Sequence, residues 1–473
     1  MALDCDVVVV GSGPNGLAAA ITLARAGLEV VVLEAATEPG GGTRTSELTL
    51  PGFKHDVCSA IHPLAVASPF FKQLPLEDFG LRMTHPGVPL AHPLDDGTAG
   101  VLDVSLTATA EGLGRDGPVY EKLMKRFVEN ADTLIDEALR PFRIPRHPFL
   151  MASFGLRGIR SAEGLATSRF KEDRTRALIA GMGAHSMLRL DQNLTGGVSL
   201  LLAMLGHSVG WPLPIGGSQK ISEALVGYLE SLGGSIVTNR RVASMEDLPV
   251  SRAAVFDVTP RQLDEIAGSR LSSGYRRRLR KFRYGPGVFK IDLAIDGPIP
   301  WKAEVCRRAG TVHLGGTLPE IAASEVAVVS GGVSERPYVL LAQQSLFDKT
   351  RAPEGKHTVW AYCHVPSGST IDMTDRIESQ IERFAPGFRE LIIGRRAMNA
   401  AEFERYNPNY VGGDINGGVQ DLRQHFARPM LRLHPHTTSD KAIFLCSSST
   451  PPGGGVHGLC GAFAAKEVLR RLN

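Results

Sequence analysis

The sequence predicts an α/β protein in which a parallel-sheet domain is discontinuous along the chain and a second, α+β domain is inserted into it. Three observations carry this prediction: a strand–turn–helix–strand pattern at residues 4–35, a strand–turn–helix pattern at 442–472, and a mixture of helical and alternating-strand patterns between them. A length of 473 residues is enough for about two or three folded units.

Residues 4–35 form the clearest unit, with the sequence DCDVVVVGSGPNGLAAAITLARAGLEVVVLEA. A run of valines is followed by a glycine turn and a periodic apolar helix that stops at Gly27, and a second valine run ends in Glu34. This order of elements predicts a βαβ unit.

The glycines of this unit predict a dinucleotide site. Gly11, Gly13 and Gly16 spell GxGxxG between a strand and a helix, so that Gly11 makes the turn, Gly13 lets a pyrophosphate approach and Gly16 packs helix on strand. Glu34 follows Gly16 by 18 residues, where a carboxylate accepts hydrogen bonds from ribose hydroxyls and repels a 2′-phosphate, which disfavours NADP. The alternative is a glycine turn in a domain that binds no nucleotide.

Two further glycine-rich segments favour FAD over NAD. Gly40, Gly41 and Gly42 follow Glu34 and let the chain turn back over the phosphates. Near the C-terminus, SSSTPPGGGVHGLCGAFAAKEVLRRL offers a second helix N-terminus, suited to the flavin's pyrimidine carbonyl and to the negative charge at N1. Gly453, Gly455 and Gly458 also spell GxGxxG, but no second strand with a ribose acid follows, so we reject a second dinucleotide site.

The rest of the chain divides between the two domains. Residues 76–100 are irregular, 120–205 are mostly helical with 119–139 the clearest stretch, 211–242 pass from turn to helix to strand, and 251–260 are a buried strand. Alternating, more polar strands at 288–295, 326–329, 338–343 and 357–364 predict a separate antiparallel sheet. We therefore assign 1–75, 206–265 and 425–473 to the nucleotide-binding domain, and 76–205 and 266–424 to a substrate domain whose helical part spans about 105–205.

Composition excludes several function classes. A hydrophobic content of 43%, a charged content of 21% and a net charge of +3 are ordinary for a globular protein and give no reason to expect nucleic acid as a partner. The six cysteines are scattered without metal-ligand spacing, so we expect reduced thiols, no metal site and a cytoplasmic protein. The first six residues carry two acids, unlike a secretory signal, and no stretch is apolar enough to span a bilayer.

Three segments carry a resemblance to a known family: VVVVGSGPNGLAAAITLARAG, EPGGGTRTSELTLPGFKHDVCSAIHP and FLCSSSTPPGGGVHGLCG. They resemble the phytoene dehydrogenase-related flavoproteins, which are relatives of carotenoid desaturases and flavin amine oxidases. The resemblance covers essentially the whole chain. It implies a Rossmann-like, glutathione-reductase-like FAD-binding domain, a substrate domain with a mixed or antiparallel sheet, and a substrate tunnel over the isoalloxazine ring. FAD is expected to be noncovalent, because residues 410–414 contain no cysteine at the place where amine oxidases carry theirs.

The resemblance also implies which residues contact the cofactor. They are Gly11, Gly13, Pro14, Asn15 and Gly16 at the pyrophosphate, Glu34 and Ala35 at the adenosine ribose, Gly41, Gly42 and Arg44 at the phosphate and ribityl region, Val242 at adenine, and Gly454, Gly455, Val456 and Leu459 against the flavin. The sequence departs from the family at Gly42, where relatives with a GGR form carry arginine. Arg44 is the residue that could substitute for it.

Candidate catalytic residues are Lys290, His62 and His55. By resemblance, Lys290 stands where amine oxidases hold a water near flavin N5, and the alternative is a surface lysine on an alternating strand. His55 and His62 follow the phosphate loop and could move a proton at neutral pH, although buried histidines with satisfied hydrogen bonds are common. His457 is a comparable candidate, His207 and Trp211 could line the cavity but are rather expected to pack in the core, and Asp414 and Arg423 are expected to be structural or to bridge domains.

The leading functional hypothesis is an FAD-dependent oxidoreductase that desaturates an apolar, lipid-like or polyene-like substrate by hydride transfer to flavin N5. Electrons are expected to leave to oxygen or a quinone, since a single dinucleotide fold leaves no place for a nicotinamide. The alternatives are a peroxide-producing amine oxidase, a double-bond isomerase that uses reduced flavin, and an FAD-bound scaffold protein. The family resemblance also admits peripheral contact with a membrane and a homodimer.

Overall fold

The chain folds around two sheets, and the computed structural model describes residues 4–141 and 143–472. The 17 α-helices of these residues are α1 Pro14–Ala24, α2 Pro63–Ala67, α3 Leu106–Gly112, α4 Gly117–Glu129, α5 Ala131–Ala138, α6 Pro148–Gly158, α7 Ala162–Arg169, α8 Asp173–Ala184, α9 Thr195–Ser208, α10 Gln219–Ser231, α11 Pro260–Ala267, α12 Ser273–Leu279, α13 Leu318–Val329, α14 Thr374–Phe384, α15 Ala400–Tyr406, α16 Leu422–His425 and α17 Leu459–Leu472.

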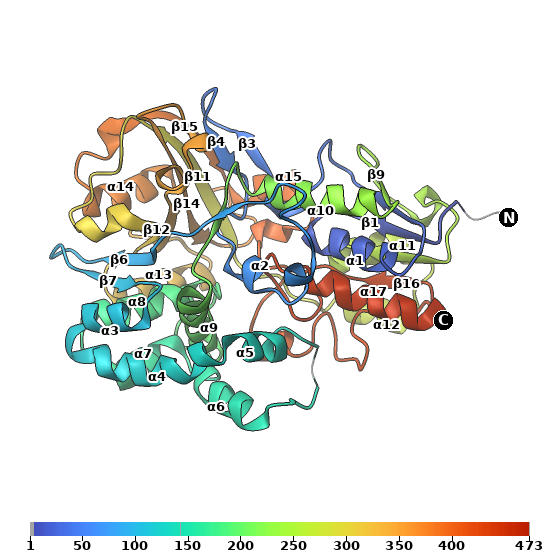
Figure 1. Cartoon of the computed structure of the whole chain (residues 1–473), viewed down its shortest axis with the longest axis horizontal. Coiled ribbons are helices and arrows are strands. Elements are labelled where there is room, and N and C mark those ends of the chain that lie inside the picture. The colour runs from blue at the N-terminus through green and yellow to red at the C-terminus, as the bar shows by residue number, and fades with distance from the viewer. Residues whose placement is uncertain (1–3, 142, 473) are drawn as a thin grey trace.

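A five-stranded parallel sheet forms the half of the molecule that lies to the right in Figure 1. Its order is β16-β10-β1-β2-β9, and the strands are β1 Val7–Val10, β2 Val30–Leu33, β9 Ser235–Val237, β10 Ala253–Phe256 and β16 Ile443–Leu445. The central strands are buried on both faces, which explains why β1 and β2 read as continuous valine runs instead of alternating with polar residues. The predicted βαβ unit is thus present, and its sheet is completed by segments from the middle and the end of the chain.

A seven-stranded mixed sheet forms the other half. Its order is β15-β11-β14-β13-β12-β6-β7, and all its neighbours are antiparallel except β12 and β6. The strands are β6 Val88–Pro93, β7 Ala99–Leu102, β11 Gly287–Ile295, β12 Ala309–Leu314, β13 Val339–Ala342, β14 His357–Val365 and β15 Ile392–Met398. Two short ribbons, β3 Thr45–Glu47 with β4 Lys54–Asp56 and β5 Met83–Thr84 with β8 Leu213–Pro214, complete the strands.

Successive residues of the strands in this sheet face opposite sides, and the two faces differ in character. Phe289, Ile291 and Leu293 of β11 share a core with Ile377 and Ile381 of α14, on one face of the sheet. The residues between them in sequence, with Trp360 and Tyr362 of β14 opposite, face the other way. The face turned away from α14 therefore carries the polar and aromatic side chains of the sheet.

Two sequence predictions were wrong in this region. Residues 326–329 were predicted as a strand but end helix α13, which begins with a capping box between Thr317 and Glu320. A four-residue apolar run has no period of its own, so the run alone cannot distinguish a strand from the last turn of a helix. Residues 76–100 were described as irregular, yet they contain β5, β6 and the start of β7, with Pro89 and Pro93 inside β6.

All strands of the parallel sheet fall inside the ranges 1–75, 206–265 and 425–473, and all strands of the mixed sheet fall inside 76–205 and 266–424. Helix α12, however, packs its Tyr275 and Leu279 in the same core as β10 and β16 of the parallel sheet. The domain boundaries themselves stay predictions. Helices α4 to α9 gather below the mixed sheet in Figure 1, as the helical pattern of 120–205 predicted, although Asn130 divides 119–139 into two helices.

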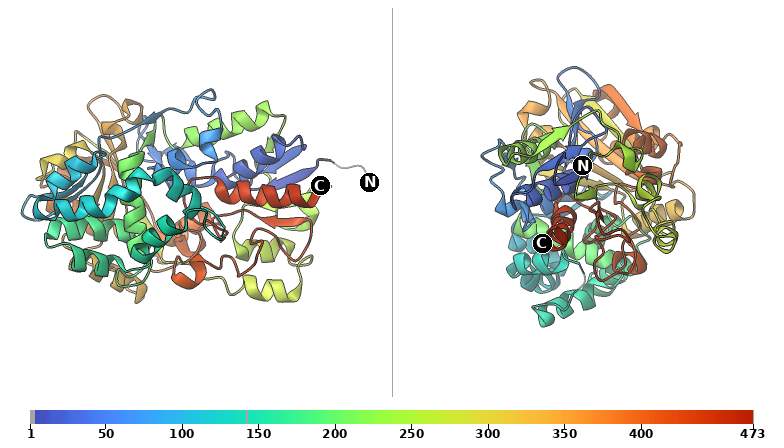
Figure 2. Two further views of the ribbon diagram at one scale, coloured as in Figure 1. Left: turned by 60° about the horizontal axis from the view of Figure 1, so that its bottom comes forward. Right: turned by 90° about the vertical axis from the view of Figure 1, so that its right-hand side faces the viewer.

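The two terminal segments lie side by side. Helices α1 and α17 run together at one end of the molecule in all three ribbon views (Figures 1 and 2). They approach so closely that a Cβ atom on Gly461 of α17 would lie 1.8 Å from the carbonyl oxygen of Asn15 in α1. None of the helices of the described residues is both long enough and apolar enough to cross a bilayer.

The contact between α1 and α17 predicts a sharp effect of one methyl group. Gly461→Ala places a Cβ against helix backbone that cannot rotate away, so we expect a loss of about 3 kcal/mol in unfolding free energy, at the upper end of the usual cost of overpacking. Gly155→Ala in α6, where a Cβ meets nothing within 4 Å, is the matched control and should be neutral or stabilising. Equal urea midpoints for the two variants would contradict the close packing.

Candidate functional site

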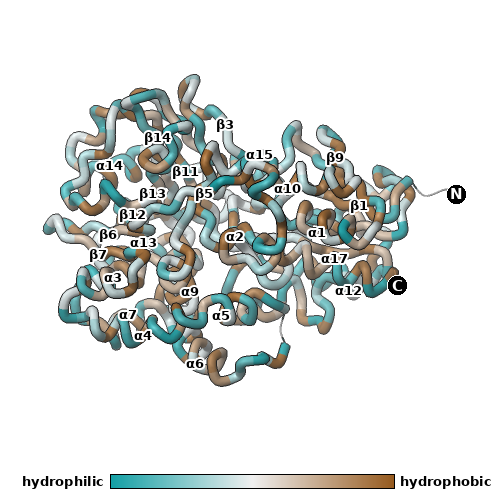
Figure 3. Tube along the Cα trace, viewed as in Figure 1, coloured by the Kyte–Doolittle hydropathy of each residue, from teal (hydrophilic) through white to brown (hydrophobic). Residues whose placement is uncertain are grey.

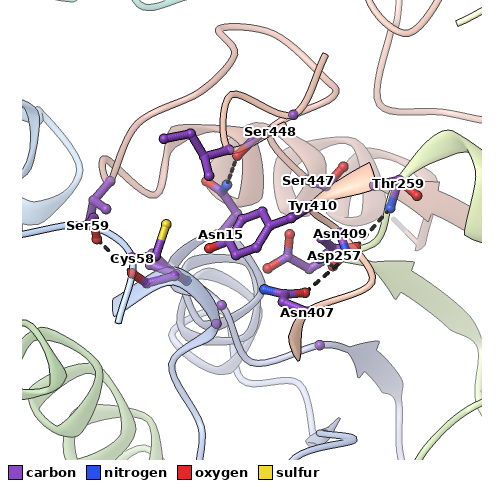
Figure 4. Close-up of a pocket in the computed structure, with 18 of the residues that line it drawn as sticks. Asn15, Cys58, Ser59, Asp257, Thr259, Asn407, Asn409, Tyr410, Ser447 and Ser448 are labelled. Carbon is purple, nitrogen blue, oxygen red and sulfur yellow. Dashed lines mark hydrogen bonds between the residues drawn. The ribbon is translucent and has the colours of Figure 1, made fainter. Parts of the chain in front are cut away.

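A cavity of about 830 Å³ runs from the parallel sheet to the mixed sheet. Its wall takes residues from the carboxyl ends of β1, β2 and β10, from the loop before α17, and from β12, β13 and β14. In an open parallel sheet, the crevice outside the carboxyl ends of the strands is the usual place for a ligand. Figure 4 shows the middle of the cavity, with side chains from both ends of the chain directed into it.

Two glycine loops form the middle of the cavity. Gly11 has a φ of +99°, which an L-residue rarely adopts, and a Cβ on Gly16 would lie 2.0 Å from the Gly11 carbonyl oxygen. The second loop touches the first, because a Cβ on Gly41 would lie 3.0 Å from the Cα of Gly13. Helix α1 begins beside this contact with Pro14 and has no acidic residue in its first turn. The loops leave room for an anion at a helix N-terminus and for no side chain.

Glu34 and Arg44 lie together at one end of the cavity. The Glu34 carboxylate accepts hydrogen bonds from the backbone N–H of Ser12 and of Ala36, both at 2.9 Å, and from the Ser12 hydroxyl. Arg44 adds an ion pair to Glu34 at 3.2 Å, and its guanidinium also lies 5.8 Å from the ring of Tyr406. Arg44 therefore neutralises Glu34, and its assignment to the phosphate and ribityl region stays a prediction.

Asp257 is a site residue that the sequence analysis missed. It follows β10, and its Oδ2 accepts a hydrogen bond from the Gly16 N–H at 2.9 Å. Burial and, to a smaller extent, the nearby charge of Glu34 raise the pKa of this carboxyl to about 7, against the opposing effect of the Gly16 hydrogen bond. The signal was present, because Asp257 is the one carboxylate within 251–260, the run predicted as a buried strand, and the carboxyl ends of parallel strands meet at the edge where Gly11 and Gly13 lie.

The opposite end of the cavity is mostly apolar and aromatic. Its wall contains Leu202, Trp211, Leu340, Trp360 and Tyr362, with Thr311 and His185 as polar members. Leu340, Trp360 and Tyr362 stand on the face of the mixed sheet turned away from α14, so the strand alternation described above forms this wall. Trp211, which was expected in the core and considered for the cavity, belongs to both: it is buried, and it lies in the wall with its indole N–H donating to the Leu202 carbonyl at 3.2 Å.

Lys290 is buried, with 2% of its surface exposed, so the alternative of a surface lysine was wrong. Its ammonium pairs with Asp292 two residues along β11 and lies 5.8 Å from the centre of the Trp360 ring. Burial raises the pKa of Asp292 to about 6, and the charge of Lys290 opposes that shift. Lys290 is not itself in the cavity wall, and its role next to a flavin stays a prediction.

The histidine candidates differ in position. His62 lies in the wall and its Nε2 meets the Ser218 hydroxyl at 2.8 Å; burial lowers its pKa to about 4. His55 lies outside the wall, 3.5 Å from Asp292, and burial lowers its pKa to about 3. Both ring nitrogens of His457 bind backbone around the loop before α17, and His207 binds the Tyr120 hydroxyl, so these two are structural.

The loop before α17 supplies part of the wall. Gly455 and Val456 line the cavity, whereas Gly454 packs against the carbonyl of Asn416 and Leu459 starts the helix. At position 42 this chain has glycine where relatives with a GGR form carry arginine, and the residue that faces this position explains the difference. A Cβ on Gly42 would lie 2.6 Å from the Tyr410 hydroxyl, so Tyr410 occupies the space that a side chain at position 42 would need.

The structure thus brings most of the predicted residues to one cavity. Those in its wall are Gly11, Gly13, Pro14, Asn15, Glu34, Ala35, Gly41, Gly42, Arg44, His62, Val242, Gly455 and Val456. Those outside the wall are Gly16, His55, Lys290, Gly454 and Leu459. Asp414 accepts three backbone N–H groups, from Gly285, Asn416 and Gly418, and ties two loops together, as a structural role requires.

Sequence comparison agrees with the fold. Residues 9–74 match the family of NAD(P)-binding Rossmann-like domains. The chain is 26% identical to the pyridine nucleotide-disulfide oxidoreductase domain-containing protein 2 of Rattus norvegicus, covering 99% of this chain and 94% of the rat protein. It is 22% identical to the lycopene-forming phytoene desaturase of Pantoea ananas, covering 98% of both chains.

Solved structures share the architecture. A variant of putrescine oxidase superposes with a TM-score of 0.61 at 18% sequence identity, covering 99% of both chains. At this identity the likeness concerns the fold, a Rossmann-like domain joined to a domain with a mixed sheet. The full-length sequence relatives are oxidoreductases, phytoene desaturases among them, and together with the glycine loops they support a relation of the chain to the phytoene dehydrogenase-related flavin oxidoreductases.

Proposed function

We propose that the protein binds FAD noncovalently in the 830 Å³ cavity and desaturates an apolar substrate at its aromatic end. The observation that carries this proposal is the contact between the two glycine loops at the N-terminus of α1, with a cavity that continues from there to Trp360 and Tyr362. When bound, FAD supplies the acceptor for the hydride that leaves the substrate. The protein supplies position, exclusion of water and the proton-handling groups.

The residues of the cavity fit an extended dinucleotide. Val242 and Ala35 would lie against adenosine, the two glycine loops against the pyrophosphate, and Gly455 and Val456 against the ring system. The Glu34 carboxylate already has four donors, from Ser12, Ala36 and Arg44, so a ribose hydroxyl would replace the Ser12 hydroxyl or Arg44. Noncovalent binding is supported by the lack of cysteine at residues 410–414.

The substrate is proposed to be apolar because the end of the cavity remote from Glu34 has a mostly apolar wall. Its aromatic and aliphatic side chains offer no fixed charge to a ligand, and the nearest ammonium, Lys290, is neutralised by Asp292. An amine oxidase is the second candidate, supported by the fold shared with putrescine oxidase and by Lys290 on β11. Oxygen or a quinone is proposed as the electron acceptor, because FAD would occupy the one dinucleotide site that the sequence predicts and would leave none for a nicotinamide.

The proposal also includes contact with a membrane surface, through α6 and the loop before it. Ile144, Phe149 and Leu156 are 91%, 85% and 73% exposed, and the helix stands at the lower edge of the molecule with apolar positions along it (Figures 1 and 3). No aspartate or glutamate occurs from 138 to 162. Arg146, Arg157 and Arg160 take part in no ion pair with the described residues. Exposed apolar side chains among unpaired arginines suit an anionic lipid surface.

The proposed reaction is tested by anaerobic mixing. The purified protein should carry a flavin band near ~450 nm that is released by denaturation, and phytoene dispersed in detergent should bleach it and lose two hydrogens per desaturation. Peroxide release from simple amines, lost in Lys290→Met, would instead favour the amine oxidase. A product of unchanged mass, made only under reducing conditions, would favour an isomerase. A flavin that dithionite reduces but that no substrate reduces would favour an FAD-bound scaffold protein without enzymatic activity.

Asp257 predicts a pH dependence of FAD binding. The pyrophosphate carries negative charge, so the cofactor binds best when Asp257 is neutral, and affinity should fall up to tenfold per pH unit above about 7. Titrations of apoprotein with FAD from pH 6 to 8.5 measure this; Asp257→Asn should bind with a flat profile, and Glu265→Gln in the same wall should keep the wild-type slope. If the FAD affinity of Asp257→Asn still fell with pH as in the wild type, Asp257 would not be the titrating group.

The same shift affects stability without cofactor. The pKa of Asp257 is raised from 3.8 in the unfolded chain to about 7, so the folded protein holds this proton more tightly. The contribution of Asp257 to the free energy of unfolding is therefore fully present below about pH 4 and is lost as the pH rises through 7.

The membrane contact is tested by co-sedimentation with vesicles. Vesicles of phosphatidylcholine with a quarter phosphatidylserine should retain the protein at low salt, and Phe149→Ser with Leu156→Ser should reduce binding by about tenfold or more, because two apolar side chains leave the lipid. Ile393→Ser, on β15 at the opposite edge of the molecule, is the control and should bind as wild type. Equal binding of both variants would exclude α6 as the docking element.

A further inference from the structure

Four histidines, of which three are buried and His185 is partly exposed, gather behind the aromatic end of the cavity. They come from four separate elements: His92 from β6, His185 from the end of α8, His313 from β12 and His364 from β14. Of the four, only His185 belongs to the cavity wall. Its ring packs edge-to-face on Trp211 at 6.0 Å, and its Nε2 lies 3.0 Å from Nε2 of His313. The cluster thus begins at the cavity and continues into the mixed sheet.

His313 and His92 continue the chain of rings. A Cβ on Gly181 would lie 2.8 Å from Nδ1 of His313 and 3.2 Å from Nδ1 of His92, so both nitrogens face the same point. Neither has a hydrogen-bond partner in the described part of the chain, and both are buried. The ring centroids are 6.5 Å apart, a separation at which one water molecule or a small shift joins the two nitrogens. Nε2 of His92 lies 2.7 Å from the Gly316 carbonyl oxygen.

This order of contacts favours one position for each proton. The Gly316 carbonyl can only accept, so His92 carries its proton on Nε2 and has a lone pair on Nδ1. The favourable partner for that lone pair is an N–H on Nδ1 of His313, and with its proton on Nδ1 the His313 ring has only a lone pair on Nε2, which accepts. His185 then donates from its Nε2 to His313, and its Nδ1 keeps a lone pair.

We propose that His185 is the base that removes the proton from the substrate during desaturation, with His313 and His92 as positioning residues that hold its tautomer. The inference rests on the proposed function. Desaturation breaks two C–H bonds: one hydrogen leaves as hydride to the flavin, the other leaves as a proton to Nδ1 of His185, and the electron pair of the second bond forms the new π bond. Electrons and protons therefore balance with the flavin as sole oxidant.

The surroundings keep His185 available as a base. Burial lowers the pKa of His185 to about 3, and the neighbouring His364 adds to this, so the ring is neutral in neutral solution. A weak base is sufficient, because loss of hydride makes the neighbouring C–H strongly acidic. His62, the other histidine of the wall, has its Nδ1 buried and without access to the cavity. His185 is therefore the better placed of the two.

The tautomers can be measured without any substrate. In holoprotein labelled with ¹⁵N-histidine, nitrogen chemical shifts distinguish Nδ1–H from Nε2–H, and single His→Gln variants assign the signals. We expect Nε2–H for His185 and His92 and Nδ1–H for His313. His313→Leu should remove the preference of His185, whereas His313→Gln, whose amide oxygen can still accept, should retain it. A proton on Nδ1 of His185 in the wild type overturns the proposal.

The reaction gives a second, separate test with phytoene as the probe. His185→Gln keeps a donor toward His313 but has no base, so the rate of flavin bleaching should fall by about 100-fold or more while flavin content and dithionite reduction are unchanged. Imidazole added to His185→Gly should restore part of the rate, which a purely structural histidine would not allow. His357→Gln, outside the wall on β14, is the control. If wild type bleaches and His185→Gln bleaches equally fast, His185 is not the base.

Discussion

The close approach of backbone at glycine is the constraint on which the rest of this structure depends. Gly16 lets α1 meet the turn at Gly11, Gly41 lets the second loop meet Gly13, and Gly461 lets α17 meet α1. Each contact involves main-chain atoms that cannot move aside, so a single methyl group would separate them. Because of these contacts, segments more than 400 residues apart in sequence meet at one cavity, and the helix N-terminus of α1 faces it without a side chain in the way.

The mixed sheet supplies the other half of the site by strict alternation. One face shares an apolar core with α14, and the opposite face carries Trp360, Tyr362, Lys290 and His313. Charges buried on that face are compensated locally, since Lys290 is paired with Asp292 and His364 with Glu325 at 2.9 Å. A buried charge is far costlier without its partner than within an ion pair, and because these charges are paired, the wall at the aromatic end of the cavity carries no net charge from them.

Burial sets the proton chemistry of the cavity. It lowers the pKa of His62 and His185, so that both are neutral near pH 7, and it raises the pKa of Asp257 to about 7, so that this carboxyl is about half protonated there. Burial thus favours the uncharged forms both beside the glycine loops in the middle of the cavity and at its aromatic end.

The sequence by itself determined the βαβ unit, the glycine loops and strands β11, β13 and β14 of the mixed sheet, because each has a local signature: a turn that only glycine can make, or an alternation with period two. It did not determine β6, β7, β12, β15, the end of α13, Asp257 or His185. Residues 326–329 became helical through a cap nine residues upstream, and Asp257 and His185 acquire their roles only from neighbours across the fold. Burial and hydrogen-bond partners are properties of the packed chain, and so the tertiary structure alone decided which histidines, His62 and His185, belong to the cavity wall.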